Sequence, residues 1–333
     1  MINYKDSGVD IDKGNRFVDS VKKLSKGLPT EGFISKIGGF SSLFSLNQFG
    51  CDSVIASTTD GVGTKLKIAF LADKHDSVGI DLVAMNVNDI ITTGIMPTFF
   101  LDYIAYSQLS DKVLEDIFKG IADGLKQSNC AIAGGETAQM PSMYKDGEYD
   151  LAGFCVGIGK QDEIFNGNIK AGDCLIGIAS SGFHSNGYSL IRKAFFELAK
   201  YSLDNLIGTK TLAEILLTPT TIYVPHIKLI KQYVKAAAHI TGGGFIENIP
   251  RCLEGFGCEI NTQVIPTQEE FLLVQDITKL QKQEMYRTFN MGIGFVVVVE
   301  ESNKDIVLNT LQSHKIKSYH IGNVVKESGV CLK

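Results

Sequence analysis

Carboxylates that follow glycine-rich segments are the residues of this sequence best suited to chemistry. Asp60 stands in TTDGVGTK at positions 58–65, and Glu136 stands in AGGETAQMP at positions 133–141. Glycines allow backbone N–H groups to face a phosphate, and a nearby carboxylate can hold a metal ion that bridges phosphate oxygens. The first segment lacks the spacing of a Walker A loop and of a dinucleotide-binding fingerprint. A plain turn with a solvated carboxylate is the alternative interpretation of each loop.

A largely apolar helix is expected to carry further carboxylates in GIDLVAMNVNDII, at positions 79–91. Apolar residues on most sides predict that this helix is buried. Asp81 and Asp89 are eight residues apart, which places them roughly on one face. Asp81 would be stabilised at the helix N-terminus, whereas Asp89 has no such reason to be buried. A ligand role is therefore predicted for Asp89.

Two later loops are suited to binding an anion. The segment SSGFHSNGYSL at 180–190 combines hydroxyl groups, glycines and asparagine between an expected strand and an expected helix. This composition suits a group such as a ribose phosphate, and His184 is either a general acid or base there or a structural residue. Three consecutive glycines at 242–244 predict close approach of the backbone to a ligand or to another loop. Gly38 and Gly39 fit either a lid over phosphates or an N-terminal arm.

Three separated carboxylates and several glycine turns point to one class of chemistry. Asp60, Asp89 and Glu136 provide the hard oxygen ligands that Mg²⁺ prefers together with substrate phosphates. No Ser-His-Asp or Cys-His grouping can be recognised in the sequence. The residues therefore indicate Mg²⁺-dependent handling of a phosphate compound, without specifying the reaction.

Strand-like runs alternate with helical patterns along the chain, which predicts a mixed α/β (α+β) fold. Strands are expected at 53–59, 131–133, 151–158, 174–179, 237–240 and 294–299. Helices are expected at 82–93, 111–127, 188–198 and 304–313, with a helical hairpin near 222–234. A polar connector at 159–173 suggests a boundary between two domains, which we predict at residues 1–165 and 166–333.

Length and composition exclude several other classes of protein. The chain has 333 residues, enough for about two domains, and 44% hydrophobic residues. A net charge of −5 argues against a general nucleic-acid or anionic membrane surface. The seven cysteines are odd in number and form no C-x-x-C pair, which disfavours zinc, redox and disulfide frameworks. The acidic N-terminus is no signal peptide and no apolar run spans a membrane, so a cytoplasmic protein is expected.

The order and spacing of eight segments resemble those of the phosphoribosylformylglycinamidine cyclo-ligase family, also called aminoimidazole ribonucleotide synthetases. The resemblance extends from about Tyr4 to about Val325. The segments are TTDGVGTK, GIDLVAMNVNDI, FFLDY, GGETAQMP, DLAGFCVG, SSGFHSNGYSLIR, TGGGFIENIPR and MYRTFNMGIG. TDGVGTK and the GGET loop occur across a wider ATP-binding superfamily, whereas the last three segments point to the cyclo-ligase family itself.

The resemblance implies an ATP-dependent ring closure. ATP would phosphorylate the formyl amide oxygen of formylglycinamidine ribonucleotide, a nitrogen would attack the activated carbon, and phosphate would leave to give aminoimidazole ribonucleotide. It implies ATP and Mg²⁺ as cofactors, with K⁺ as a further candidate cation. It also implies a homodimer in which N-terminal sheets form a barrel across the interface, followed by a C-terminal α/β domain, with no nucleic acid or membrane partner.

The resemblance also implies roles for individual residues. Mg²⁺ would be held by Asp60, Asp89 and Glu136, and the catalytic residues would be His184, Asp89 and Lys65. ATP and phosphate would be bound by Gly38, Gly39, Asp60, Gly61, Gly63 and Thr64. The substrate would be bound by Ser181, Gly182, Ser185, Asn186, Thr241, Gly242 and Gly243.

The sequence departs from the family pattern at a few positions, and two other functions stay open. Gln139 stands where many relatives have Glu, so it is not counted as a metal ligand. Ser41 and Ser42 stand where relatives often have another glycine, which would stiffen the lid. The alternatives are another enzyme of the superfamily, such as a selenophosphate synthetase or a thiamine-monophosphate kinase, and a catalytically silent nucleotide-binding protein.

Overall fold

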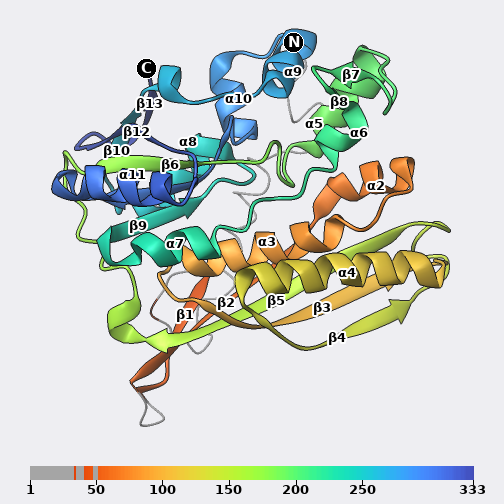
Figure 1. The fold of residues 1–333 in the computed structure, drawn as a ribbon, viewed down its shortest axis with the longest axis horizontal. Helices are drawn as coiled ribbons and strands as arrows, with labels where there is room; N and C mark the ends of the chain where they lie inside the picture. The colour runs from red at the N-terminus through yellow and green to blue at the C-terminus, as the bar shows by residue number, and fades with distance from the viewer. Residues whose placement is uncertain (1–33, 35–40, 48–51) are drawn as a thin grey trace, which may run out of the picture.

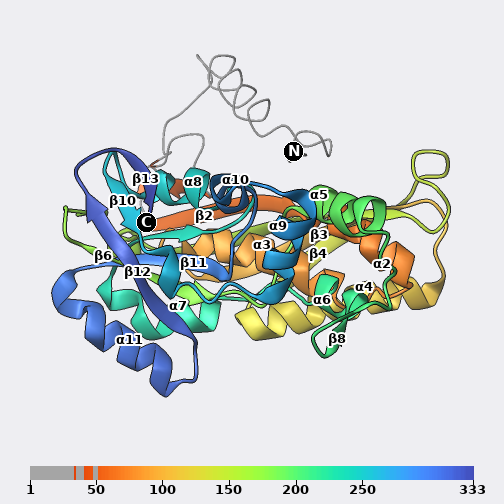
Figure 2. The ribbon, with the colours of Figure 1, turned by 90° about the horizontal axis from the view of Figure 1, so that it is seen from above.

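The structure is a computed structural model that describes residue 34, residues 41–47 and residues 52–333. The described chain forms two large sheets with helices packed against them (Figures 1 and 2). The predicted mixed α+β fold class is therefore confirmed. Across residues 34, 41–47 and 52–333, no helix is long and apolar enough to cross a membrane.

The first sheet has five strands in the order β1-β2-β5-β3-β4. Their bounds are β1 Ser42–Ser45, β2 Ser53–Gly61, β3 Pro97–Tyr106, β4 Ala131–Gln139 and β5 Tyr149–Lys160. β3 and β4 are parallel, and the other neighbours are antiparallel. β2, β4 and β5 were predicted from the sequence, whereas β3, which contains the FFLDY segment, was not. β3 lies between β5 and β4 and therefore separates two of the predicted site loops.

Helices cover one face of this sheet (Figure 1). They are α3 (Val78–Ile91) and α4 (Asp111–Ser128), preceded by the 3-10 turn η3 (Gly63–Lys65) and by α2 (Leu66–Ala72). The predicted helix at 111–127 corresponds to α4, and its N-terminus is capped by Ser110. A Cβ atom at Gly79 would lie 2.3 Å from the backbone oxygen of Ile117. Glycine at this position therefore permits the close crossing of α3 and α4.

The other face of the first sheet carries exposed apolar side chains. Tyr103 of β3 is 40% exposed, and Phe154 and Ile158 of β5 are 44% and 47% exposed. The side chain of residue 103 shares a face with residue 152, its register partner, and hence with residues 154 and 158. We call this surface the open sheet face.

The second sheet has six strands in the order β13-β10-β12-β6-β11-β9. Their bounds are β6 Cys174–Ala179, β9 Val234–His239, β10 Gly257–Ile260, β11 Ile293–Val299, β12 Ser318–Val325 and β13 Gly329–Leu332. β11 is buried along its whole length, as the continuous apolar run at 295–299 predicts. Only the β10–β13 pair is parallel among the strand pairs of this sheet.

The part of the chain that contains the second sheet also forms mostly short helices. They are α5 Tyr188–Arg192, the π-helix η5 Lys193–Leu198, α6 Leu212–Leu216, α7 Val224–Ile230, α8 Gly244–Asn248, α9 Glu269–Thr278, α10 Lys282–Thr288 and α11 Lys304–Ser313. A small hairpin joins β7 (Leu206–Ile207) and β8 (Lys210–Thr211). The helical hairpin predicted near 222–234 is wrong. One helix, α7, and a 3-10 turn fill this segment, because β9 already begins at Val234.

The helix α3 lies between the two sheets (Figure 1). We call the part of the chain that contains the first sheet the first half, and the part that contains the second sheet the second half. The helix α3 packs on β2 and β5 on one side, and it contacts α7 and β9 of the second half on the other. Every residue of α3 except Ile80 is buried. The sequence pattern predicted such a buried helix, and its polar residues must therefore find partners in both halves. The domain boundary at 165/166 stays a prediction.

Candidate active site

A cavity of about 480 Å³ lies where the two halves meet. It is lined by Thr59, Asp60, Gly61, Val62, Gly63, Met85, Asp150, Leu151, Ala152, Ser185, Asn186 and Thr241. Four segments that were predicted to contain site residues, at 58–65, 79–91, 180–190 and 241–251, therefore contribute to one cavity. Asp150 also lines the cavity and was not predicted as a site residue, although it opens the DLAGFCVG segment that carried the resemblance.

Asp60 is positioned by the end of β2. Its Oδ1 accepts a hydrogen bond of 2.8 Å from the Gly61 backbone N–H. Asp60 pairs with Gly153 of β5, so the two residues face the same side of the sheet. A Cβ atom at Gly153 would lie 2.6 Å from Nδ2 of Asn86 on α3. Asp60 therefore lies on the helix-covered side of the sheet. Burial and the charge of Asp89 raise the pKa of the Asp60 carboxyl to about 6.

Asp89 is held near the C-terminal end of α3. Its side chain is 13% exposed, and Oδ1 lies 2.8 Å from Nδ1 of His239, at the end of β9. Burial raises the pKa of Asp89, and the contact with His239 opposes this effect. Two carboxylates with raised pKa values that repel each other form a site that favours a cation.

The donor set at Asp60 and Asp89 fits Mg²⁺ bound together with phosphates. Residues 34, 41–47 and 52–333 contain no group of three or more His, Cys, Asp or Glu side chains that could hold a metal ion alone. Mg²⁺ is usually bound by one or two protein carboxylates, with water and substrate phosphates as its remaining ligands. Asp60 lines the cavity beside glycine turns, and Asp89, which does not line it, interacts electrostatically with Asp60, so the pair matches that pattern.

Glu136 is not brought to Asp60 and Asp89 within this chain. The residue before it, Gly135, pairs with Asp102 of β3, and Asp102 pairs with Gly153 of β5. Gly153 in turn pairs with Asp60 of β2, so Gly135 and Asp60 lie on the same side of the sheet. Successive side chains of a strand point to opposite faces, so Glu136 points to the open sheet face. β3 and β5 also separate β4 from β2. The expected cluster of three carboxylates is therefore not formed by one copy of the chain.

Lys65 is buried and fully hydrogen-bonded instead of facing the cavity. Its Nζ lies 2.9 Å from Asp81, and it donates to the backbone oxygens of His184 at 3.0 Å and Thr218 at 2.7 Å. Both Lys65 and Asp81 have fully buried side chains, and burial lowers the pKa of Lys65 while Asp81 raises it. An ammonium group has three N–H donors, so these partners leave none for a phosphate. The geometry thus favours a positioning role for Lys65 over the predicted catalytic one.

His184 lies in the substrate-side loop, but its ring is enclosed. The residue is 1% exposed and adopts a positive φ of 60°. Its Nε2 accepts a hydrogen bond of 3.2 Å from the backbone N–H of Ser181, and burial lowers the pKa of the imidazole well below its usual value. His184 does not line the cavity, whereas Ser185 and Asn186 beside it do. A neutral ring that shapes the loop fits these contacts better than the predicted acid–base role.

The remaining predicted residues lie around the cavity or outside the described chain. Thr64 and Ser189 have hydroxyl oxygens 3.3 Å apart, which joins the Asp60 loop to α5. The backbone N–H of Thr241 donates to Asn248 Oδ1 at 2.8 Å and so shapes the start of the glycine segment. Gly182 adopts a φ of +144°, a conformation that favours glycine. Gly38 and Gly39 lie outside the described residues, so the predicted lid is untested.

The glycine segment after β9 requires glycine at two positions. Gly243 and Gly244 adopt φ values of +98° and +54°. A Cβ atom at residue 244 would lie 2.1 Å from the backbone oxygen of Tyr286. The prediction of close backbone approach in this segment is confirmed at Gly244, where the approaching partner is α10.

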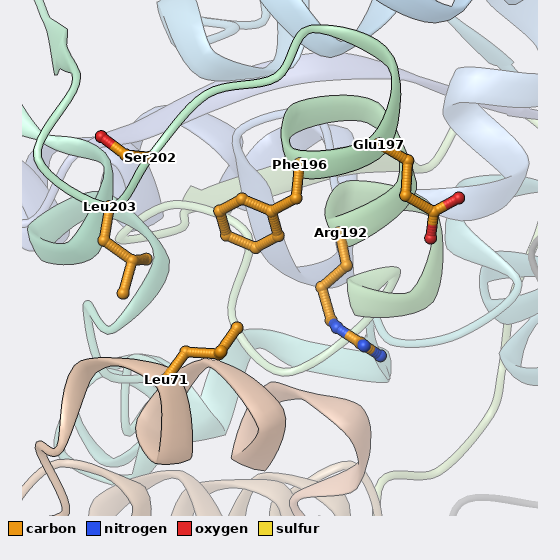
Figure 3. Close-up of a pocket in the computed structure, with 6 residues that line it drawn as sticks. All are labelled: Leu71, Arg192, Phe196, Glu197, Ser202 and Leu203. Carbon is orange, nitrogen blue, oxygen red and sulfur yellow. The ribbon is translucent and has the colours of Figure 1, made fainter.

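A second cavity, of about 390 Å³, lies between α2 and the π-helix η5 (Figure 3). In Figure 3 the side chains of Leu71, Phe196 and Leu203 face one another across it, with Arg192 at its edge. None of the residues that line it was predicted as a site residue. It also lacks a pair of carboxylates, so the cavity at Asp60 is the stronger candidate for phosphate chemistry.

Family models match most of the described chain. The model "AIR synthase related protein, N-terminal domain" matches residues 44–159, and "AIR synthase related protein, C-terminal domain" matches residues 170–332. The two matched segments coincide with the two large sheets.

Curated relatives match nearly the whole chain. A "Phosphoribosylformylglycinamidine cyclo-ligase" of Thermoanaerobacter pseudethanolicus is 52% identical over 337 residues, covering 99% of this chain and 100% of the relative. The protein of the same name from Bacillus cytotoxicus is 49% identical over 336 residues, covering 99% of this chain and 97% of the relative.

Solved structures with low sequence identity share the fold. "AaThiL complexed with AMPPCP and TMP" has a TM-score of 0.66 and 16% identity, covering 94% of this chain and 92% of that chain. The "HypE-HypF complex" has a TM-score of 0.67 and 19% identity, covering 94% of this chain and 95% of that chain. "T. maritima PurL complexed with ATP" has a TM-score of 0.58 and 13% identity, covering 84% of this chain and 42% of that chain.

The buried position of Lys65 leads to a prediction about stability. Lys65→Met keeps the length of the side chain but leaves the Asp81 carboxylate buried without its cation. We expect the free energy of unfolding to fall by about 3–5 kcal/mol, as measured by urea denaturation. Lys67→Met is the matched control, because it breaks an exposed ion pair with Glu148 and is expected to cost less than about 1 kcal/mol. Equal losses in the two variants would contradict the positioning role of Lys65.

The raised pKa of Asp60 leads to a prediction about pH. The pKa is about 6 in the fold, against 3.8 without burial. The folded chain therefore binds more protons than the unfolded chain between these values, and the unfolding free energy falls as pH rises. We expect metal-free Asp60→Asn to be more stable than the parent protein at pH 7.5 and to match it near pH 4, in urea denaturation with a chelator. Asp305→Asn, at an exposed carboxylate, should not change the pH profile. Lower stability of Asp60→Asn at pH 7.5 would refute this account.

Proposed function

The chain belongs to the phosphoribosylformylglycinamidine cyclo-ligase family, and from this membership we propose that it is an ATP-dependent cyclo-ligase of purine biosynthesis. The observation that carries the proposal is the identity of 48–52% to curated cyclo-ligases along 99% of this chain. The cavity lined by Asp60, whose carboxyl interacts electrostatically with Asp89, supports it, because the reaction needs a place for the phosphates of ATP beside the substrate.

The proposed reaction turns a poor leaving group into a good one. The γ-phosphoryl group of ATP passes to the formyl amide oxygen of formylglycinamidine ribonucleotide, which yields ADP. A nitrogen of the amidine part then attacks the activated carbon, a C–N bond forms, and the C–O bond breaks as phosphate leaves. The product is aminoimidazole ribonucleotide. The chain contributes by holding the nitrogen close to the carbon, which is worth several kcal/mol.

The residues around the cavity divide into two groups in this proposal. Asp60 and Asp89 would hold Mg²⁺, which when bound neutralises charge on the phosphates. The backbone N–H of Gly63, with Thr64, would face the phosphates, as would Gly38 and Gly39, while Gly61, whose N–H is bonded to Asp60 Oδ1, would allow close approach of the backbone. Ser181, Gly182, Ser185, Asn186, Thr241, Gly242 and Gly243 would bind the substrate.

Asp150 also lines the cavity, and its carboxylate would accept a hydrogen bond from either the substrate or the nucleotide. A K⁺ requirement and a cytoplasmic location stay predictions.

A homodimer built through the open sheet face is part of the same proposal. Tyr103, Phe154 and Ile158 are each at least 40% exposed there, and contiguous exposed apolar side chains are typical of protein interfaces. Isologous dimers bury the same patch of both copies. Glu136 points to this face, so it would lie against the partner subunit and could serve the partner's cavity.

The alternative functions are less well supported. A sister enzyme of the superfamily would share the fold but not the close identity to cyclo-ligases, and the solved structures of that kind are only 13–19% identical. A silent nucleotide-binding protein would not be expected to keep two desolvated carboxylates, Asp60 at the cavity and Asp89 near it in charge interaction, since burying them is costly.

The proposed activity is tested by incubating purified protein with Mg²⁺, ATP and formylglycinamidine ribonucleotide. We expect ADP and aminoimidazole ribonucleotide to form in equal amounts. Asp89→Asn should lower kcat by about 100-fold or more, because it removes a ligand of the ion that stabilises transferring charge. Asp305→Asn, far from the cavity, is the control. ADP formation that ignores the substrate would favour a sister enzyme, and nucleotide binding without turnover would favour the silent protein.

The proposed dimer is tested by Phe154→Lys on the open sheet face. A buried lysine without a partner charge is costly, so we expect the dimer to dissociate, as measured by light scattering after gel filtration. Phe118→Lys is the matched control, because Phe118 is 47% exposed on α4, against 44% for Phe154. A dimer that survives Phe154→Lys would place the interface elsewhere.

Subunit mixing then tests whether Glu136 acts across the interface. Glu136→Gln and Asp89→Asn should each be nearly inactive alone. If Glu136 serves the partner's cavity, mixed dimers contain one intact site, and re-equilibrated mixtures should regain about a quarter of the activity. No recovery would place both residues in the same subunit's site.

A further inference from the structure

We propose that His239 is a positioning residue that orients the Asp89 carboxylate for a divalent cation. The proposal rests on the proposed function in one respect, namely that Asp89 is a ligand of Mg²⁺. His239 was not among the residues that the sequence pointed to, and it comes from the second half of the chain. It stands at the end of β9, directly before the segment ITGGGF.

The hydrogen bonds of Asn88 define which nitrogen of the His239 imidazole carries the hydrogen. Asn88 Oδ1 accepts from the backbone N–H of Tyr223 at 2.8 Å, and Nδ2 donates to the backbone oxygen of Thr221 at 2.8 Å. This arrangement fixes the orientation of the amide, so that Nδ2 also faces His239 Nε2, 3.5 Å away. Nε2 therefore accepts, and Nδ1 carries the hydrogen.

The proton on Nδ1 is directed at the proposed metal ligand. Nδ1 lies 2.8 Å from Asp89 Oδ1 and donates to it. A hydrogen bond to one carboxylate oxygen restricts rotation about the Cβ–Cγ bond and leaves the other oxygen available to a cation. Hydrogen bonds of this kind to the ligands of a metal typically determine their orientation and raise metal affinity.

The imidazole itself is held by the second sheet. The side chain of His239 is fully buried, and its ring centroid lies 6.2 Å from that of Phe295 on the neighbouring strand β11. His239 and Phe295 are also register partners in the β9–β11 pair. The ring cannot swing away without opening the core, so the second half determines the orientation of a carboxylate in the first half.

The test compares two amides at position 239. In His239→Asn, the side-chain N–H₂ reaches the place of Nδ1, whereas in His239→Gln it reaches the place of Nε2. We expect the Gln variant to bind Mn²⁺ alone about 10–100-fold more weakly than the parent protein, measured by electron paramagnetic resonance without nucleotide. The Asn variant should stay within a few-fold of the parent protein. Equal affinities of the two variants would overturn the proposal.

Activity and a control variant separate the positioning role from a merely structural one. The Gln variant should need more Mg²⁺ for half-maximal turnover, with kcat restored at saturating Mg²⁺, and the Asn variant should be close to the parent protein. His75→Gln is the control, because His75 is 6% exposed and bonded through Nδ1 to Tyr149 Oη at 2.9 Å in the first half. It should change stability without changing Mn²⁺ affinity. The same loss of affinity in this control would overturn the proposal.

Two further results keep this proposal distinguishable from the assignment of Asp89. If Asp89→Asn binds Mn²⁺ as well as the parent protein, then Asp89 is not a ligand and the proposed metal site fails. If Asp89→Asn loses Mn²⁺ while His239→Gln keeps it, only the role of His239 fails. Nitrogen NMR of the parent protein labelled at histidine needs no variant and should show hydrogen on Nδ1 of His239. A hydrogen on Nε2 instead would overturn the proposal even if a variant failed to fold.

Discussion

The buried ion pair of Lys65 and Asp81 is the interaction on which the arrangement of the two halves depends. Removing two charges from water costs several kcal/mol, so the pair needs further partners. They come from the second half: Thr220 donates twice to Asp81 at 2.7 Å, and the backbone oxygens of His184 and Thr218 accept from Lys65. Because both charges also bond to these segments, the packing of the two halves and the placement of the substrate-side loop both depend on this ion pair.

The helix α3 extends this dependence to the cavity. An apolar helix buried between two sheets tolerates polar residues only where each has a partner. Asn86 donates to the backbone oxygen of Asp60, Asn88 bonds to the segment before α7, and Asp89 bonds to His239. The first partner belongs to the first sheet and the others to the second half. The polar positions of α3 therefore link the Asp60 loop to the substrate side through one rigid element.

Much of the fold and part of the site could be predicted from the sequence. The apolar periodicity of α4 and the continuous apolar run of β11 are local signals, and glycine loops after strands indicated the cavity walls at Asp60, Ser185 and Thr241. The side-chain partners could not be predicted, because they are set by tertiary contacts. Lys65 follows a glycine loop just as a phosphate-binding lysine would, and only its burial beside Asp81 shows otherwise.

Glu136 shows most clearly what residue type and spacing leave open. A glycine loop with a carboxylate indicates an oxygen ligand. Alternate residues of a strand point to opposite faces of the sheet, so a shift of one residue along the strand changes which cavity the carboxylate can reach. Gly135 shares the face of Asp60, and Glu136 therefore faces the other way. β3, which was not predicted from the sequence, adds a further strand between them. A carboxylate on the exposed, apolar face of a sheet can meet phosphate chemistry only if a second surface brings that chemistry to it.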